Sequence, residues 1–392
     1  MATFAAILIV PWLLALVLTP LVIRVAHARG YLDHPTARKA HKAPVAIFGG
    51  VAVFGSIALG LLALAPFIPP VGGTLLGAES LGALGLGALL MVVLGGYDDL
   101  YDMRPMHKLA AQIAIAALTW LMGFRVGAIE LPFELLLSAA TPVSLIATVA
   151  WIVIVSNAFN LIDGIDGLAG GVSVITALTV FLLANQNGAT VPVIAALALS
   201  GALAGFLRYN LPPARIFLGD AGALSIGYLI AVLAMASYQK SPAAVAMVVP
   251  LLVLGLPLLD SILAVIRRGL VHLRTRGAKG LHPWAIIRAV TLADRGHLHH
   301  LLLRNGLSVP ESLAVLYAIC IALAAVGLGT RELSSTLRWG LFAGLIAAGY
   351  AGLRVLERRA ARRDHEQQAR SAASAAAAAP GRIVEERRRI AG

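Results

Sequence analysis

The sequence contains a single cysteine, Cys320, and few charged residues. One cysteine cannot form a disulfide within the chain, and it excludes a zinc site built from several thiolates. Only 13% of the 392 residues are charged, whereas soluble proteins average about 25%. Apolar residues make up 59% of the chain, and the mean hydropathy is +0.87. This composition excludes a soluble domain and predicts an all-α polytopic membrane protein, because helices satisfy their own backbone groups in hydrocarbon.

Apolar runs of about 20 residues, which suffice to cross a bilayer as a helix, recur along the chain. The first run has no basic residues before it and is long for a cleaved signal, so we interpret it as an uncleaved span. We predict about eleven transmembrane helices, near residues 2–23, 47–67, 81–97, 109–124, 142–158, 170–185, 191–208, 222–238, 243–266, 311–329 and 335–355.

Basic residues are distributed unequally between the two sides that these spans define. All of the 31 Lys and Arg residues lie on one side except Arg125, Lys240, Arg331 and Arg338. The positive-inside rule assigns the basic side to the cytoplasm, which places the N-terminus outside and the C-terminus inside. No nucleic-acid partner is predicted from the net charge of +12, because the basic residues lie in short loops and a tail.

The chain is predicted to have one folded domain. Residues 1–355 form the transmembrane domain with its cytoplasmic active-site loops. Residues 356–392 are rich in Arg and Ala, and we predict a disordered cytoplasmic tail after an amphipathic extension of the last helix.

Three aspartates follow Gly95-Gly96 at the cytoplasmic end of the third span. If the helix continues, Asp98 and Asp102 share one face and Asp99 lies about 100° away. Carboxylates this close repel one another unless a cation binds, and Mg²⁺ prefers oxygen ligands. The pattern indicates a metal or phosphate site, with a hydrated helix end as the alternative.

Polar side chains recur at every third position between the fifth and sixth spans. They are Asn157, Asn160, Asp163 and Asp166, and glycines stand at 164, 167 and 170. Polar groups at membrane depth are tolerated where they line a cavity. A capping and turn segment explains the glycines but not two Asn with two Asp, so the pattern favours a ligand site.

Two further segments combine charge with glycine or histidine. Asp220 lies between Gly219 and Gly222, where it is either a site residue approached closely by backbone or an N-cap of the next helix. His297, His299 and His300 lie in a basic loop; phosphate contact fits them better than zinc, because no cysteine is near.

The first basic loop also holds a pattern that charge alone does not explain. Arg38, Lys39 and His41 precede Pro44 and the pair Gly49-Gly50. The positive-inside rule accounts for the charge of this loop but not for the His-Lys-x-Pro-x4-Gly-Gly arrangement.

Taken together, these five segments resemble the polyprenyl-phosphate N-acetylhexosamine-1-phosphate transferase superfamily, glycosyltransferase family 4. The resemblance runs from about residue 30 to 305, with the motifs in family order. His297-Leu-His-His and Pro257-Leu-Leu-Asp260 are similar to the GlcNAc-1-phosphate transferase branch, which starts O-antigen, enterobacterial common antigen or wall teichoic acid. The family's usual Pro-x-Pro reads Pro44-Val45-Ala46 here.

The resemblance implies an enzyme that transfers N-acetylhexosamine 1-phosphate, with GlcNAc favoured, from a UDP-sugar to undecaprenyl phosphate, releasing UMP. It implies a bacterial inner-membrane protein whose active site faces the cytoplasm, with Mg²⁺ as cofactor and Mn²⁺ as a substitute. Lipid I synthesis is the alternative within the superfamily, and an ion-coupled transporter is the remote one. A homodimer is left open.

Site residues follow from the motifs and the resemblance together. Catalytic roles are expected for Asp98, Asp99, Asp163 and Asp166, and a metal site is expected at Asp220 and Asn160. Substrate-binding roles are expected for Asn157, His297, His299, His300, Arg38, Lys39, His41, Arg215 and Asp260.

Overall fold

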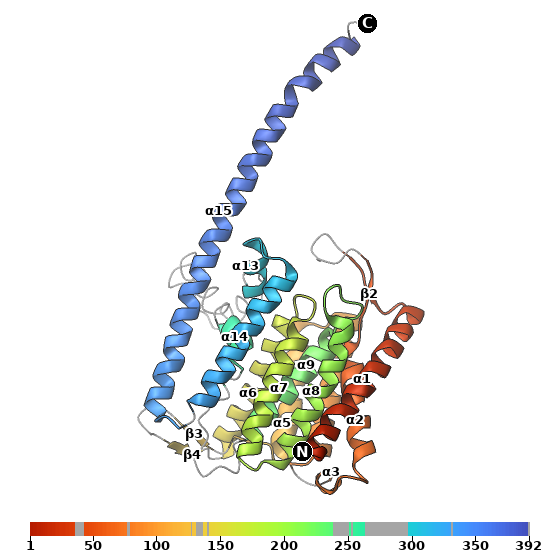
Figure 1. Ribbon diagram of the computed structural model, residues 1–392, viewed down its shortest axis with the longest axis vertical. Coiled ribbons are helices and arrows are strands. Elements are labelled where there is room, and N and C mark those ends of the chain that lie inside the picture. The colour runs from red at the N-terminus through yellow and green to blue at the C-terminus, as the bar shows by residue number, and fades with distance from the viewer. Residues whose placement is uncertain are drawn as a thin grey trace.

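The computed structural model describes most of the chain as helices packed into a bundle (Figure 1). The described residues are 1–35, 43–76, 79–126, 128–130, 136–138, 141–237, 251, 254–262, 297–330 and 332–390. Among these, eight helices are long and apolar enough to cross a membrane, and α2 is a shorter apolar helix. The prediction of an all-α polytopic membrane protein is confirmed.

The first half of the bundle contains six helices and one small hairpin. They are α1 (Ala2–Arg29), β1 (Leu32–Asp33), β2 (Val45–Ala46), α2 (Gly49–Leu64), α3 (Pro69–Gly72), α4 (Leu81–Tyr101), α5 (Pro105–Leu121) and α6 (Thr141–Ile162). β1 and β2 pair antiparallel, with Leu32 opposite Ala46. A second antiparallel pair, β3 (Ala128–Glu130) and β4 (Leu136–Ser138), precedes α6.

The second half continues with α7 (Leu168–Gln186), α8 (Thr190–Asn210), α9 (Gly219–Ala236), α13 (Leu298–Arg304), α14 (Val309–Gly329) and α15 (Ser335–Ile390). Each predicted span except 243–266 corresponds to one helix, and most of 243–266 lies outside the described residues. The count of eleven and the orientation in the membrane stay predictions.

Helix α9 lies at the centre of the bundle and sets the position of the site. Every residue from Ala221 to Ala236 is buried, and α9 packs against α2, α4, α6 and α7. Two glycines permit the closest of these approaches. A Cβ at Gly50 would collide with the backbone of Gly222, and one at Gly95 would collide with the backbone of Asp220. Small residues at helix contacts let backbones approach in this way, so the start of α9 packs closely between α2 and α4.

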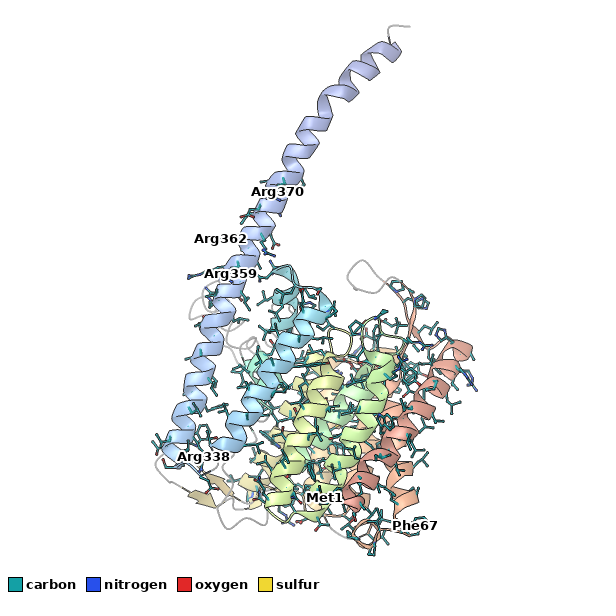
Figure 2. All side chains as sticks on the ribbon, in the orientation of Figure 1. Met1, Phe67, Arg338, Arg359, Arg362 and Arg370 are labelled. Carbon is teal, nitrogen blue, oxygen red and sulfur yellow. The ribbon has the colours of Figure 1, made fainter. Side chains whose placement is uncertain are left out.

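Different segments of the chain lie at the two ends of the bundle. The N-terminus and Phe67 lie at one end, and β2, α13 and the start of α9 lie toward the other (Figures 1 and 2). Helix α15 rises along the bundle and continues beyond it, where Arg359, Arg362 and Arg370 project from the helix (Figure 2). The division of the chain at residue 356 into a transmembrane domain and a disordered tail stays a prediction, and α15 runs as one helix across that boundary.

Candidate active site

Helices α4, α5 and α6 each bring a polar side chain to Asp220 at the start of α9. The Nζ atom of Lys108 on α5 lies 2.8 Å from Oδ2 of Asp98 on α4, and it also contacts Oδ2 of Asp220 on α9. The other oxygen of Asp220 accepts a hydrogen bond of 2.7 Å from Nδ2 of Asn160 on α6. Residues that are far apart in the sequence therefore form one cluster, with an ammonium group between two carboxylates.

Asp99 connects α4 to α9 through the backbone. Its Oδ1 accepts a hydrogen bond of 2.8 Å from the N–H of Asp220, and its Oδ2 accepts one of 3.1 Å from the N–H of Ala221. These N–H groups belong to the first turn of α9, where no intrahelical acceptor exists. Asp99, rather than Asp220, thus caps α9, and its negative charge faces the positive end of the helix dipole.

The expectation that Asp98 and Asp102 share a helix face is wrong. Helix α4 ends at Tyr101, and Asp102 is its C-cap residue in the left-handed region with φ of 48°. The chain turns there, and the N–H of Met103 donates a hydrogen bond of 2.7 Å to Oδ1 of Asp98. Asp98 consequently faces the cluster, while Asp102 is exposed.

Lys108 is the member of the cluster that sequence reasoning missed, since it was counted only as a basic loop residue. One helical turn further, Gln112 is buried and faces Asn157. Nδ2 of Asn157 donates to Oε1 of Gln112 at 2.8 Å and to the carbonyl of Val153 at 2.8 Å. The sequence did contain a signal for this pair, because Lys108 and Gln112 are spaced i, i+4 at the start of an otherwise apolar span.

Asp163 and Asp166 lie in the turn between α6 and α7. Burial raises the pKa of Asp163 to about 7, and the negative charges of Asp220, Asp99 and Asp166 raise it further in the same direction. Asp163 is therefore close enough to the cluster to sense its excess negative charge. Oδ2 of Asp166 accepts a hydrogen bond of 2.9 Å from the N–H of Ala214 and so holds the loop that precedes α9.

Arg215 follows directly in that loop and is exposed. Its guanidinium carbon lies 6.0 Å from the centre of the Tyr209 ring. The side chain is thus exposed and lies near Tyr209, and its predicted role in substrate binding stays a prediction.

The histidine segment packs on the turn that carries Asp163. His299 is 2% exposed, and a Cβ added to Gly164 would collide with Nε2 of its ring. The rings of His299 and His300 lie 4.2 Å apart, and His297 stacks on His299 at 6.0 Å. Burial, followed by the charge of His300, lowers the pKa of His299 to about 4, so the ring is neutral near pH 7.

Asp260 holds the beginning of α13. Its Oδ2 lies 2.8 Å from Nδ1 of His297, and its Oδ1 accepts a hydrogen bond of 2.8 Å from the N–H of Leu298. Both Asp260 and His297 are 5% exposed. Because both carboxylate oxygens are engaged, Asp260 is placed to orient the histidine segment.

The oxygen atoms of this cluster are of the type that Mg²⁺ prefers. Asp98 and Asp220 share one ammonium group, and the pKa of Asp163 is raised by burial first and then by the negative charges of Asp220, Asp99 and Asp166. Within the described ranges no group of three His, Cys, Asp or Glu side chains is arranged as a complete metal site. A Mg²⁺ ion at Asp220 would therefore complete its shell with water and phosphate oxygens, as is usual for this ion.

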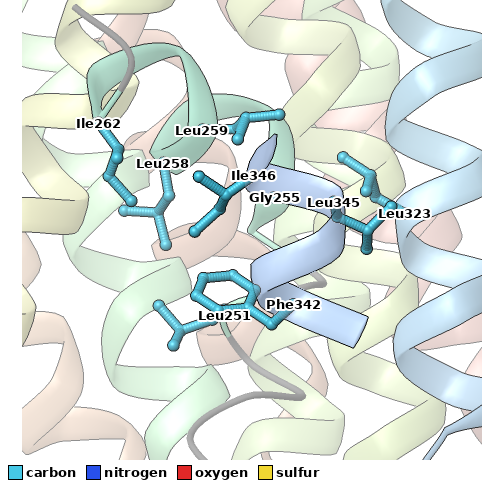
Figure 3. Close-up of a pocket in the computed structure, with 9 residues that line it drawn as sticks. All are labelled: Leu251, Gly255, Leu258, Leu259, Ile262, Leu323, Phe342, Leu345 and Ile346. Carbon is cyan, nitrogen blue, oxygen red and sulfur yellow. The ribbon is translucent and has the colours of Figure 1, made fainter. Parts of the chain in front are cut away.

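Three predicted site residues, Arg38, Lys39 and His41, lie outside the described residues. A separate small pocket lies between the helical stretch 255–262, α14 and α15, and Figure 3 shows Leu259, Leu323 and Phe342 among its lining residues. All nine lining residues are apolar or glycine, so this pocket offers no group for phosphate or metal.

Comparison with known proteins identifies the family to which the chain is similar. A family model described as glycosyl transferase family 4 matches residues 81–238, which run from α4 to the end of α9. The chain is 33% identical over 311 residues to a protein of Bacillus subtilis named "Probable undecaprenyl-phosphate N-acetylglucosaminyl 1-phosphate transferase", covering 79% of this chain and 80% of that relative.

Two further relatives are more distant. A "Decaprenyl-phosphate N-acetylglucosaminephosphotransferase" of Mycobacterium tuberculosis is 28% identical, covering 84% of this chain and 83% of the relative. An "Undecaprenyl-phosphate alpha-N-acetylglucosaminyl 1-phosphate transferase" of Escherichia coli is 26% identical, covering 78% of this chain and 77% of the relative. The matches extend over most of each protein, so they include both the bundle and the cluster.

Proposed function

The chain belongs to glycosyl transferase family 4, and from this premise we propose that it transfers N-acetylglucosamine 1-phosphate from UDP-GlcNAc to undecaprenyl phosphate. The observation that carries the proposal is the cluster of Asp98, Lys108, Asn160 and Asp220 at one end of a membrane bundle. A lipid acceptor and a water-soluble nucleotide donor can meet only at a membrane face. The products are undecaprenyl-diphosphate-GlcNAc and UMP, which is the first membrane step of a cell-envelope glycan.

The reaction is a phosphoryl-type transfer. An oxygen of the lipid phosphate forms a bond to the β-phosphorus of UDP-GlcNAc, and the bond from that phosphorus to the oxygen bridging to the α-phosphate breaks. The bonding electrons leave with UMP. Such transfers are governed by positioning and by charge stabilisation, which are what a rigid cluster of charged groups supplies.

The residues of the cluster divide this work. Asp98 and Lys108 are placed to orient the lipid phosphate, and Asp99 keeps the start of α9 in position. Mg²⁺, held by Asp220 with Asn160 beside it, would neutralise the pyrophosphate of the donor. Asp163, Asp166, Asn157 and the histidine segment form the surroundings of the nucleotide and sugar.

Direct attack by the lipid phosphate is favoured over a covalent phospho-Asp98 intermediate. One oxygen of Asp98 accepts a hydrogen bond from the N–H of Met103 and the other pairs with Lys108, and both contacts reduce the nucleophilicity of the carboxylate. Labelled phosphate trapped on the protein in the absence of acceptor would contradict this mechanism.

The same proposal includes orientation. The cluster lies at the end of the bundle opposite the N-terminus. The loops that are rich in Lys and Arg connect the predicted spans at this same end. The positive-inside rule therefore leads us to place this face in the cytoplasm of a bacterial inner membrane. A transporter is disfavoured, because transporters place their ionisable groups near the bilayer midplane.

The test is UMP release by the purified protein in detergent, with undecaprenyl phosphate and Mg²⁺. UDP-GlcNAc is compared with UDP-MurNAc-pentapeptide, and EDTA and Asp220→Ala serve as controls. Release with UDP-GlcNAc alone, abolished in both controls, is expected. Release only with the MurNAc donor would assign the chain to lipid I synthesis, and release with neither would reject the proposed reaction.

A further inference from the structure

Helix α13, which carries His299 and His300, depends on other segments for its position. It is seven residues long, from Leu298 to Arg304. Isolated helices shorter than about 12 residues are marginal in water, so the placement of α13 must come from its contacts. Those contacts comprise a buried one at the beginning of the helix, apolar packing on the bundle, and a set with α15 at its end.

At its beginning, α13 is held by Asp260, which accepts hydrogen bonds from the backbone of Leu298 and from the ring of His297. This contact is buried and lies on the side of the helix that faces the bundle. It fixes where α13 starts, while His299 against Gly164 and Leu302 in the main apolar core hold the side of the helix that faces the bundle.

At its end, α13 is held by α15. Asn305, the C-cap residue, donates a hydrogen bond of 3.0 Å from Nδ2 to the carbonyl of Leu356. The guanidinium of Arg363 donates to the carbonyl of Asn305 and lies over Gly306, where a side chain would displace it. Gly306 has a φ of 87°, which favours glycine. Arg363 thus binds a carbonyl that the end of a helix leaves without an intrahelical donor.

Apolar contact completes this end. Leu301 of α13 and Leu353 of α15 are buried together at 1% and 3% exposure. An ion pair between Arg304 and Asp364 lies outside them, but both side chains are nearly half exposed, and pairs of this kind contribute little. Among the contacts between α13 and α15, those that matter are therefore the hydrogen bonds of Arg363 and Asn305 and the packing of the two leucines.

These contacts lie largely beyond residue 355, where the last membrane span was predicted to end. We propose that residues Leu353–Asp364 of α15 position the histidine helix for the transfer reaction, with Arg363 as a positioning residue. The inference rests on the proposed function, and it gives the first turns after the last span a role that a solvated tail would not have. The position of His299, which packs on Gly164 beside Asp163, then depends on α15, although α15 contributes no residue to the cluster.

The chain offers a matched control for Arg363. Like Arg363, its neighbour Arg362 is exposed on α15 (Figure 2) and carries the same charge, but among the described residues no hydrogen bond or ion pair joins Arg362 to α13. Both Arg363→Ala and Arg362→Ala remove one positive charge from the same turn of the same helix. Any difference between the two variants therefore reports the contact with α13 rather than the charge of the tail.

The experiment uses the full-length chain in detergent and measures two quantities. UMP release from UDP-GlcNAc should show a kcat about tenfold lower in Arg363→Ala, since small displacements of a positioned group reduce rates strongly, with KM changed less than kcat. Hydrogen exchange of residues 298–306 should be faster in Arg363→Ala. Arg362→Ala should match the wild type in both measurements.

A double-variant comparison separates positioning from general destabilisation. In a His300→Ala background, Arg363→Ala should lower kcat by much less than tenfold, because groups that act as a unit are not additive. Equal exchange in Arg362→Ala and Arg363→Ala, faster exchange with unchanged kcat, or a full tenfold loss in the His300→Ala background would each overturn the proposal. If the wild type releases no UMP, the proposed function fails, while the exchange comparison still tests the contact.

Discussion

The carboxylate of Asp99 accepts a hydrogen bond of 2.8 Å from the backbone N–H of Asp220. One aspartate of the Asp98-Asp99 pair therefore holds the helix that presents Asp220, while the other faces Asp220 across Lys108. Two adjacent residues of the same type thus have different tasks, which the direction of each side chain from α4 determines.

Asp99→Asn should lower the stability of the protein by about 1–3 kcal/mol, the cost of leaving a buried N–H without an acceptor. An asparagine can accept from Asp220 through its oxygen, but its amide nitrogen would then face the N–H of Ala221. The melting temperature in detergent measures the effect. Asp102→Asn, which removes the same charge at an exposed position three residues away, should leave it unchanged.

Lys108→Met should reduce UMP release by about 100-fold, a typical cost of removing one preorganised charge from a reaction site. The same change should tighten Mn²⁺ binding, measured by electron paramagnetic resonance without substrate, because Asp98 and Asp220 lose the cation that they share. Arg104→Met, at an exposed position of the same loop, is the control. Weaker Mn²⁺ binding in Lys108→Met would contradict the idea that lysine and metal compete for these oxygens.

Asp163 should make the stability of the metal-free protein fall as pH rises from about 4 to 7. Its pKa is raised to about 7, so in this window the folded protein keeps a proton that the unfolded chain has released. His299, with a pKa lowered to about 4, acts in the opposite sense below its unfolded value of 6.5, because the folded state has lost a proton that the unfolded chain keeps.

The wild type and Asp163→Asn share the contribution of His299, so their difference isolates Asp163. The melting temperature of the wild type minus that of the variant, measured in EDTA, should decrease between pH 5 and pH 7.5. A difference that stays constant across this range would show that Asp163 does not titrate there.

Gly164→Ala should lower UMP release by about tenfold, because the added methyl group meets the ring of His299 and the buried ring has little room to move. Gly85→Ala is the matched control, since a Cβ at Gly85 has open space around it. Activity in Gly164→Ala equal to that in Gly85→Ala would place the histidine segment elsewhere during the reaction.

Composition and hydropathy alone predict the class of the protein, and the sequence motifs already single out most of the charged residues that the structure brings together at the start of α9. Apolar runs long enough to cross a bilayer predict helices, because hydrocarbon offers the backbone no other partner, and ten of the eleven predicted spans correspond to helices. Asp98, Asp163 and Asp220 stand out in the sequence because charged side chains are rare beside apolar membrane spans.

The contacts that each of these groups makes depend on how the helices pack. Lys108 was indistinguishable from the basic residues of other loops until the packing of α5 on α4 and α6 brought it between two carboxylates. Asp102 was separated from Asp98 by the end of α4, and Asp99 became a helix cap because Gly50 and Gly95 let α9 approach closely. Contacts between helices depend on side-chain volume at distant positions, and a one-dimensional pattern of charge and hydropathy does not contain that information.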